Sequence, residues 1–410
     1  MKTAITIIFT FLLTTVYGQT GDYKVLLDSA KTLFKGEKNL NQEELDRFDY
    51  YQVVSLLEKV IELNPKNSEA RYFLGYTYSR INSRDGRGMI NMNLELVKKS
   101  SEQFEKVNKL TPKYTDEIIV LDPYSKLSAE WGSMAMSYWH NNKEDSAIWA
   151  FREGKKRGGF GDFYLSINKA VLDLCSNNSI LIASGDNFTI PLWYLQIVEG
   201  YRKDVSVIDV SLLNTTWYPS FLAKNGQIKF DLPQSVIDTI EYCKWSDTTI
   251  SIGAFSWTVK PSYYEQYILR GDRVFLSMLM KNKFKRDIYF TTAFTEDSRL
   301  SLQNYLHPLI LIDKLNTGKN SKVKYKKYKN EMSKILLHIE KVNKNSQQEL
   351  NFIDNIRYDI LSKLTELIQN KKNKQAKELM ILMDKFADDK KYPYMTEKYK
   401  EYADYLRGQL

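Results

Sequence analysis

Two short polar loops carry the side chains best suited to hold a ligand. The first loop follows an apolar run at residues 180–183, and the second follows a run at residues 205–210. Their distinctive residues are Gly185, Asp186, Asn187 and Asn214. Carboxylate and amide groups accept and donate hydrogen bonds, and the first amides of a following helix are free to bind a ligand. The two loops therefore predict a site for a small polar ligand.

Three aromatic side chains lie close to these loops in the sequence. Trp193, Trp217 and Tyr218 offer flat apolar faces that suit a sugar ring. The alternative is structural: Asp186 and Asn187 form an Asx turn that caps the next helix, and the aromatic residues pack in the core. An enzymatic role for Asp186 would further require that its carboxylate point into a pocket beside another ionisable group, and it would fail if the carboxylate only capped the helix. No catalytic residue is assigned.

Other kinds of chemistry find little support in the sequence. His140, His307 and His338 are scattered without metal-ligand spacing, and no Gly-x-Ser-x-Gly motif occurs. The glycine-rich stretch at residues 158–161 lacks a phosphate-binding lysine and reads as a helix end. Cys175 and a second cysteine, Cys243 in an expected helix, form either a disulfide or two free thiols. We predict no metal and no cofactor.

The loops must be positioned by the elements around them. The apolar run at 180–183, a helical stretch at 189–200 and the β-branched run at 205–210 make a β-α-β unit, and hence a parallel sheet. Further elements of this domain are expected at residues 214–224, 272–280, 288–292 and 309–312. We therefore predict a Rossmann-like parallel-sheet domain over residues 176–318, whose ligands sit beyond the carboxyl ends of the strands.

Helical repeats are predicted before and after this domain. Within residues 19–175, one set of residues keeps the spacing of a tetratricopeptide repeat: Trp131, Met134, Ala135, Tyr138, Ala147, Phe151 and Gly154. Gly75 marks an earlier unit, where a small residue lets a neighbouring helix approach. Residues 319–410 read as a basic linker, with the lysine-rich run at 319–329, followed by a C-terminal helical repeat.

A loop at residues 83–93, with Gly86 and Gly88, interrupts the first repeats as an insertion. Such an insertion either reaches a binding face or is a tolerated surface loop.

The N-terminus and the composition indicate the compartment. Lys2 precedes an uncharged apolar run at residues 4–16, and Val16 and Gly18 occupy the −3 and −1 positions of a signal-peptidase site. We expect a signal peptide over residues 1–18 with cleavage after Gly18. No later stretch is long and apolar enough to be a transmembrane segment. The 59 basic and 50 acidic side chains leave +9, which is too diffuse to indicate nucleic-acid binding.

Several short sequence motifs of the central segment resemble those of a known family. They are residues 180–187, 191–196, 198–200, Arg202, Asp204, Val207, 211–215, Trp217 and Tyr218. Together with residues 285–290 and 373–394, they resemble the soluble C-terminal region of protein O-mannosyltransferase-like membrane glycosyltransferases of Bacteroidota. The resemblance covers roughly residues 124–410. It implies a link to glycosyltransferases, but the relatives' membrane portion, where sugar transfer is expected, has no counterpart here. Phe188 also stands where the family has a second acid.

These observations predict an exported, periplasmic protein that binds or scaffolds in the cell envelope without catalysis. Its helical repeats would contact a protein or peptide partner, and the edge of the sheet would take a glycan or another small polar ligand. The first alternative is a sugar-handling enzyme, or an accessory subunit of protein glycosylation, with Asp186 as its acidic group. The second is an adaptor whose α/β domain binds nothing.

Overall fold

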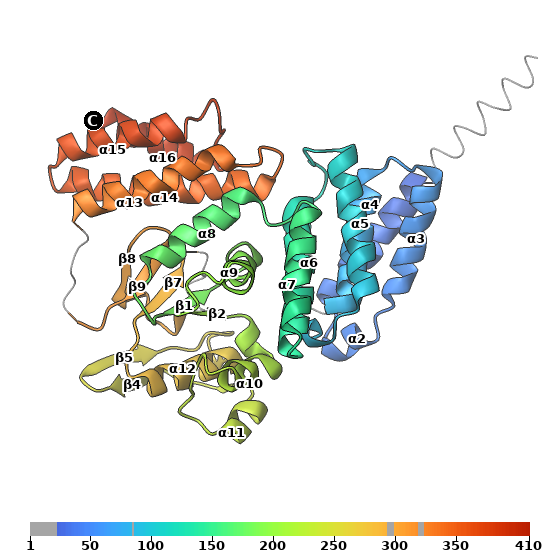
Figure 1. Ribbon diagram of the computed structural model, residues 1–410, viewed down its shortest axis with the longest axis horizontal. Coiled ribbons are helices and arrows are strands. Elements are labelled where there is room, and N and C mark those ends of the chain that lie inside the picture. The colour runs from blue at the N-terminus through green and yellow to red at the C-terminus, as the bar shows by residue number, and fades with distance from the viewer. Residues whose placement is uncertain (1–22, 84–85, 293–298, 319–323) are drawn as a thin grey trace, which may run out of the picture.

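The computed structural model describes residues 23–83, 86–292, 299–318 and 324–410. The predicted signal peptide and residues 319–323 of the lysine-rich run lie outside them. The N-terminal helices stand at one end of the molecule, and the sheet lies at the other end with the last helices on one side of it (Figure 1).

The N-terminal part is a series of packed helices. Residues 23–36 are helical, and the helices that follow are α2 (Gln42–Asp46), α3 (Tyr50–Leu63), α4 (Ser68–Ser83), α5 (Leu94–Leu110), α6 (Pro123–His140) and α7 (Glu144–Lys156). From α3 to α7, each helix packs against the next. A Cβ added at Gly75 would lie 2.8 Å from the Phe104 ring, so this glycine permits the close approach of α4 and α5. Helices stand where the repeats were expected, while their tetratricopeptide character stays a prediction.

The central sheet is mixed, which corrects the prediction of a parallel sheet. Its strands, within the described residues, are β1 (Ile180–Ala183), β2 (Ser206–Asp209), β7 (Ile288–Thr291), β8 (Leu306–Pro308) and β9 (Ile312–Leu315), in the order β2-β1-β7-β9-β8. Strands β2, β1 and β7 are parallel, with Ile180 opposite Ser206 and Ile288, whereas β9 is antiparallel to both β7 and β8. Only three residues join β8 to β9, and so short a connection makes a hairpin. The strand expected at residues 309–312 is displaced to β9.

Five helices of the described residues accompany the three parallel strands in the sequence. They are α8 (Asp162–Leu174), α9 (Asp186–Val198), α10 (Trp217–Lys224), α11 (Gln234–Thr239) and α12 (Arg270–Asn282). In Figure 1, α8 and α9 lie on one side of the sheet and α12 lies on the other. The β1–α9–β2 unit matches the predicted order, and every residue of these two strands is buried. The parallel strands therefore end together at one edge of the sheet.

The stretch between α11 and α12 contains short strands. They are β3 (Cys243–Lys244), β4 (Thr248–Ile252), β5 (Phe255–Val259) and β6 (Tyr267–Ile268). Cys243 thus lies in a strand, not in the expected helix. Both cysteines are free thiols.

The C-terminal layer is helical, as expected. Its helices are α13 (Tyr325–Leu337), α14 (Gln347–Gln369), α15 (Asn373–Phe386) and α16 (Glu397–Gly408). The described end of the lysine-rich run lies in α13, where Lys329 pairs with Glu378 at 3.0 Å.

Two hydrophobic cores form within the described residues. The first lies among the N-terminal helices and includes Phe73 and Phe104. The second is continuous from α6 and α7 through the sheet into the C-terminal helices. A Cβ added at Gly132 of α6 would lie 2.2 Å from the Ile190 side chain of α9, so bare backbone is needed where the helical part meets the α/β part. This close contact brings α6 to the edge of the sheet.

Candidate functional site

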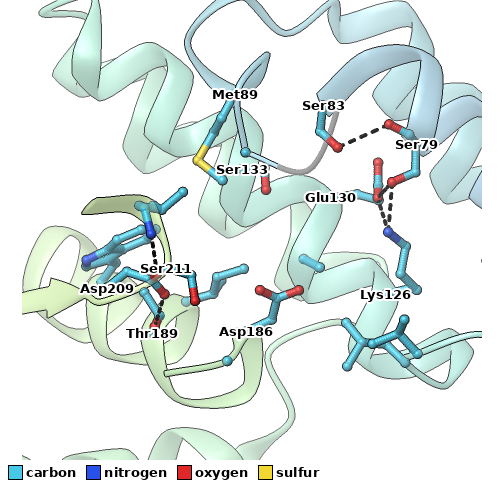
Figure 2. A pocket seen from close by; sticks show the side chains of 18 of the residues that line it. Ser79, Ser83, Met89, Lys126, Glu130, Ser133, Asp186, Thr189, Asp209 and Ser211 are labelled. Atoms are coloured by element: carbon cyan, nitrogen blue, oxygen red, sulfur yellow. Dashed lines mark hydrogen bonds and ion pairs between the residues drawn. The ribbon is translucent and has the colours of Figure 1, made fainter. Parts of the chain in front are cut away.

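A cavity of about 280 Å³ lies where α4 and α6 face the carboxyl ends of β1 and β2. Asp186 and Thr189 of α9 line one wall, and Lys126 and Glu130 of α6 line the wall opposite (Figure 2). This is the edge of the sheet at which parallel strands present ligands to the loops that follow them.

The wall from α6 is polar because of its helical spacing. Lys126, Glu130 and Ser133 follow one another at intervals of four and three residues, so they lie on one face of the helix. The helix begins at Pro123 and is capped by Asp122, whose carboxylate accepts a 2.8 Å hydrogen bond from the Ser125 amide. Together these residues fix the start of α6 three residues before Lys126.

A buried ion pair dominates this wall. Lys126 Nζ lies 2.6 Å from Glu130 Oε1, and the Ser79 hydroxyl of α4 donates to the same oxygen at 2.5 Å. Lys126 also donates to Ser79 Oγ at 2.8 Å and lies over the Tyr76 ring, 4.5 Å from its centre. The side chains are only 9% and 3% exposed, so the pair carries a large desolvation penalty.

Glu130 Oε2 has no hydrogen-bond partner among the described residues, although it is buried. An unpaired buried acceptor is costly, and native proteins satisfy most such groups. Because Glu130 lines the cavity, a donor placed there would satisfy it.

Asp186 faces the same cavity from the opposite wall (Figure 2). It follows Gly185, whose φ of +83° turns the chain from β1 into α9. Gly185 is the N-cap of α9 and Asp186 is its first helical residue, so the Asp186 side chain does not cap this helix. It therefore satisfies the geometric criterion set by the sequence: it points into a pocket beside another ionisable group.

The surroundings of Asp186 raise its pKa to about 6. The side chain is accessible from the cavity, yet surrounding protein displaces bulk water and disfavours the carboxylate. Asp209 and Glu130 raise the pKa further by repulsion, and Lys126 opposes them. Asp186 thus titrates closer to neutrality than an ordinary aspartate.

Asp209, the last residue of β2, has a positioning role. Its carboxylate accepts hydrogen bonds from the Thr189 hydroxyl at 2.6 Å and from the Leu212 amide at 2.9 Å. Burial raises its pKa, and these hydrogen bonds oppose the shift. Asp209 therefore joins the end of β2 to α9 and to η3 (Leu212–Asn214), with both oxygens occupied.

The structure brings some of the predicted ligand-binding residues together and separates others. Gly185, Asp186 and Trp193 line the cavity, whereas Asn187, Asn214, Trp217 and Tyr218 do not. The Asn187 carbonyl accepts a hydrogen bond from the Asn168 side chain at 3.2 Å.

Each of the other three residues has a structural partner. Asn214 accepts from the Gly271 amide at 2.8 Å. The buried Trp217 donates to the Gly86 carbonyl at 3.1 Å, and the buried Tyr218 hydroxyl accepts from the Asp209 amide at 3.1 Å. The packing of Trp217 and Tyr218 agrees with the structural alternative, in which the aromatic residues lie in the core.

Sequence reasoning missed the helical half of the site. The prediction did not include Lys126, Glu130 or Ser79. A lysine and a glutamate four residues apart on a packed helix is nevertheless a sequence pattern that could have indicated a buried ion pair. The insertion at residues 83–93 also reaches the cavity through Gly86 and Met89. Its position supports the first of the two interpretations given to that loop, a segment that reaches a binding face.

The described residues contain no cluster of three or more side chains able to hold a metal ion. The free oxygens of Asp186 and Glu130 are instead hydrogen-bond acceptors. The arrangement suits the binding of a ligand that donates hydrogen bonds.

One family model matches part of the chain. Residues 165–236 match a family model described as TMEM260-associated domain 2. The match runs from α8 into α11 and includes Asp186 and Asp209, but it begins after α6 and does not include Lys126 or Glu130. It is consistent with the resemblance to O-mannosyltransferase-like proteins found in the sequence. No curated protein matches the chain.

None of the described helices combines the length and the apolar character that crossing a membrane requires.

Proposed function

We propose that this is an exported, periplasmic binding protein of the cell envelope that holds a small polar ligand without transforming it. The observation that carries the proposal is the cavity with Glu130 on one wall, where a buried carboxylate oxygen lacks a donor. Asp186 offers further acceptors on the opposite wall. A glycan is the first ligand class to test, because hydroxyl groups donate hydrogen bonds and because the sequence resembles O-mannosyltransferase-like glycosyltransferases, a resemblance with which the match over residues 165–236 is consistent.

The N-terminal helices supply the second part of the proposal. We infer that they are tetratricopeptide-like and that a protein or peptide partner contacts them, as stacked helix pairs generally do. The ligand cavity lies on their sheet-facing side, so a partner on another face and a ligand in the cavity would be held by the same helices.

The ligand is tested by thermal unfolding against sugars, nucleotide-sugars and glycopeptides. A ligand at one hundred times its dissociation constant adds about 2.7 kcal/mol to the unfolding free energy. We expect a ligand to stabilise the unmodified chain and to give no stabilisation of the Glu130→Gln variant. The control Glu102→Gln changes an exposed carboxylate on α5 and should retain it. A panel without any stabilising compound contradicts the ligand proposal.

The partner is tested by crosslinking in native cells followed by identification of the linked proteins. A recurrent envelope protein supports the scaffold role. Recovery of no envelope protein, also at low salt, contradicts it.

A sugar-handling enzyme is the second candidate, and one observation favours it. Asp186 has a pKa near 6, as a general acid requires, and it faces a second carboxylate that is ion-paired with a lysine. Incubation with activated glycosides and nucleotide-sugars tests this candidate. Turnover that falls at least about a hundredfold in Asp186→Asn supports the enzyme, and the absence of turnover supports a binding protein.

A further inference from the structure

We propose that the cavity recognises a protonated primary amine carried on a small hydroxyl-bearing ligand, of the amino-sugar class. The inference rests on the proposed function, because it specifies the ligand of the same cavity.

The charges around the cavity favour a cation. Three carboxylates, those of Glu130, Asp186 and Asp209, line it against two basic side chains, Lys126 and Arg80. Arg80 lies 3.2 Å from the Glu37 carboxylate, which is outside the lining, and Lys126 is paired with Glu130. The basic groups are therefore already matched, and the cavity retains an excess of negative charge.

The open hydrogen-bonding positions are acceptors. Glu130 Oε2 is buried without a donor, and the cavity leaves the Asp186 carboxylate accessible. Asp209 contributes none, because Thr189 and Leu212 occupy its oxygens. An ammonium group presents three donors and no acceptor, so it complements two carboxylates better than a hydroxyl does.

The remaining lining sets the size and character of the ligand. A volume of about 280 Å³ lies at the lower end of ligand pockets, which suits one ring and not a chain of rings. The hydroxyl of Ser133 lines the polar side, while Ile190 and Trp193 supply apolar surface. A single ring with hydroxyl groups and one amine matches this combination.

The test compares D-glucosamine with D-glucose, which differ by an ammonium and a hydroxyl at one carbon. Titration calorimetry on the full chain at pH 7.5 should give at least tenfold tighter binding of glucosamine. Asp186→Asn should remove most of that preference, and it is expected to fold because Asp186 does not cap α9. Glu130→Gln is the second variant, with circular dichroism to verify folding, and Glu102→Gln is the control.

Each outcome separates the two proposals. Equal binding of both sugars overturns the amine inference and leaves the polar-ligand function standing. A preference for glucosamine that both Asp186→Asn and Glu130→Gln retain also overturns the inference, because the amine then lies elsewhere. If neither these sugars nor any compound of the wider panel binds, the proposed function itself fails.

Discussion

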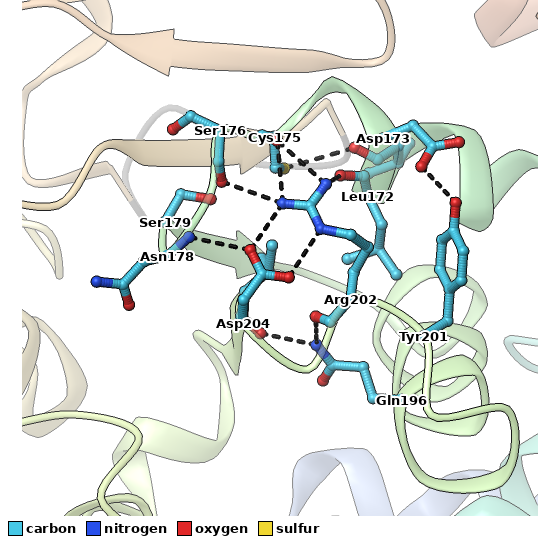
Figure 3. A network of polar contacts seen from close by, with 12 residues as sticks. Leu172, Asp173, Cys175, Ser176, Asn178, Ser179, Gln196, Tyr201, Arg202 and Asp204 are labelled. Carbon is cyan, nitrogen blue, oxygen red and sulfur yellow. Dashed lines mark hydrogen bonds and ion pairs between the residues drawn. The ribbon is translucent and has the colours of Figure 1, made fainter.

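The two edges of the same parallel strands use charged side chains in opposite ways. At the carboxyl edge, Glu130 and Asp186 face a cavity, and one carboxylate oxygen has no donor. At the amino edge, Arg202 donates to the carbonyl oxygens of Leu172, Cys175 and Ser176 (Figure 3). The carboxyl edge leaves a hydrogen-bond acceptor unpaired, whereas the amino edge uses its hydrogen bonds to stabilise the fold.

The closed edge is built from two arginines. Arg202 also binds Asp204 through two hydrogen bonds of 2.8 and 2.9 Å, and this pairing holds the pKa of Asp204 at about 2. Arg286 donates to the carbonyls of Asn178, Ser179 and Gln227 at 2.8 to 2.9 Å. Both arginines belong to the sequence motifs that resemble the family, yet their hydrogen bonds stabilise the fold. A shared sequence motif therefore does not by itself distinguish a binding site from a structural contact.

The largest expected effect comes from breaking the cavity's ion pair. Glu130→Leu leaves the buried Lys126 without its counter-charge and should lower the free energy of unfolding by about 3 kcal/mol. The double variant Lys126→Met/Glu130→Leu should recover to within about 1 kcal/mol of the unmodified chain, because it removes both desolvated charges. Urea denaturation measures both. A double variant as unstable as the single one would show that the pair serves stability and not the site.

The amino edge should respond differently to the same treatment. Arg202→Met should cost about 2 kcal/mol, since three carbonyls lose the hydrogen bonds of the arginine and Asp204 loses its counter-charge. Adding Asp204→Leu should give no recovery, because the carbonyls still lack those hydrogen bonds. Urea denaturation with the exposed Lys203→Met as control measures this, and recovery in the double variant would erase the contrast between the two edges.

Asp186→Asn should stabilise the protein at pH 7.5. The folded-state pKa of about 6 exceeds the ordinary value of 3.8, so the folded state binds more protons between these pH values and loses relative stability as pH rises through them. Because Asp186 is accessible from the cavity, the gain is discounted for solvent screening to about 1 kcal/mol. Urea denaturation should show the gain at pH 7.5 and none at pH 3. A variant less stable than the unmodified chain at pH 7.5 would assign Asp186 a structural role.

The smallest effect, of opposite sign, is expected for Asp204→Asn. The folded-state pKa of Asp204 is lowered to about 2, so its contribution is present above pH 3.8 and is lost as pH falls towards 2. With 38% of the side chain exposed, the loss at pH 7 should be about 0.5 kcal/mol. Denaturation curves at pH 7 and pH 2 should differ from the unmodified chain only at pH 7. A loss that persists at pH 2 would contradict the charge mechanism.

The sequence predicted the local elements of the site better than the contacts between them. The apolar run at residues 180–183 became β1, and Asp186 lies in the cavity because loops after parallel strands share an edge. The strand β8 was missed and β9 was expected three residues too early, because short runs carry little periodicity. Glu130 was missed for another reason: helical spacing identifies the faces of α6, but it does not say which face meets α9. That contact depends on Gly132 and Ile190, fifty-eight positions apart.

The cavity also lies at the seam between the two hydrophobic cores. Its wall includes Tyr76 from the first core and Met89, Ile190 and Leu212 from the second. A ligand bound in the cavity would contact residues of both cores. Separating the N-terminal helices from the sheet would therefore release the ligand. Occupancy and the docking of the helices are therefore thermodynamically linked. Amide exchange in α4 should slow when a ligand fills the cavity. Because the ligand makes the N-terminal helices more rigid, it would also change the affinity of a partner that binds those helices.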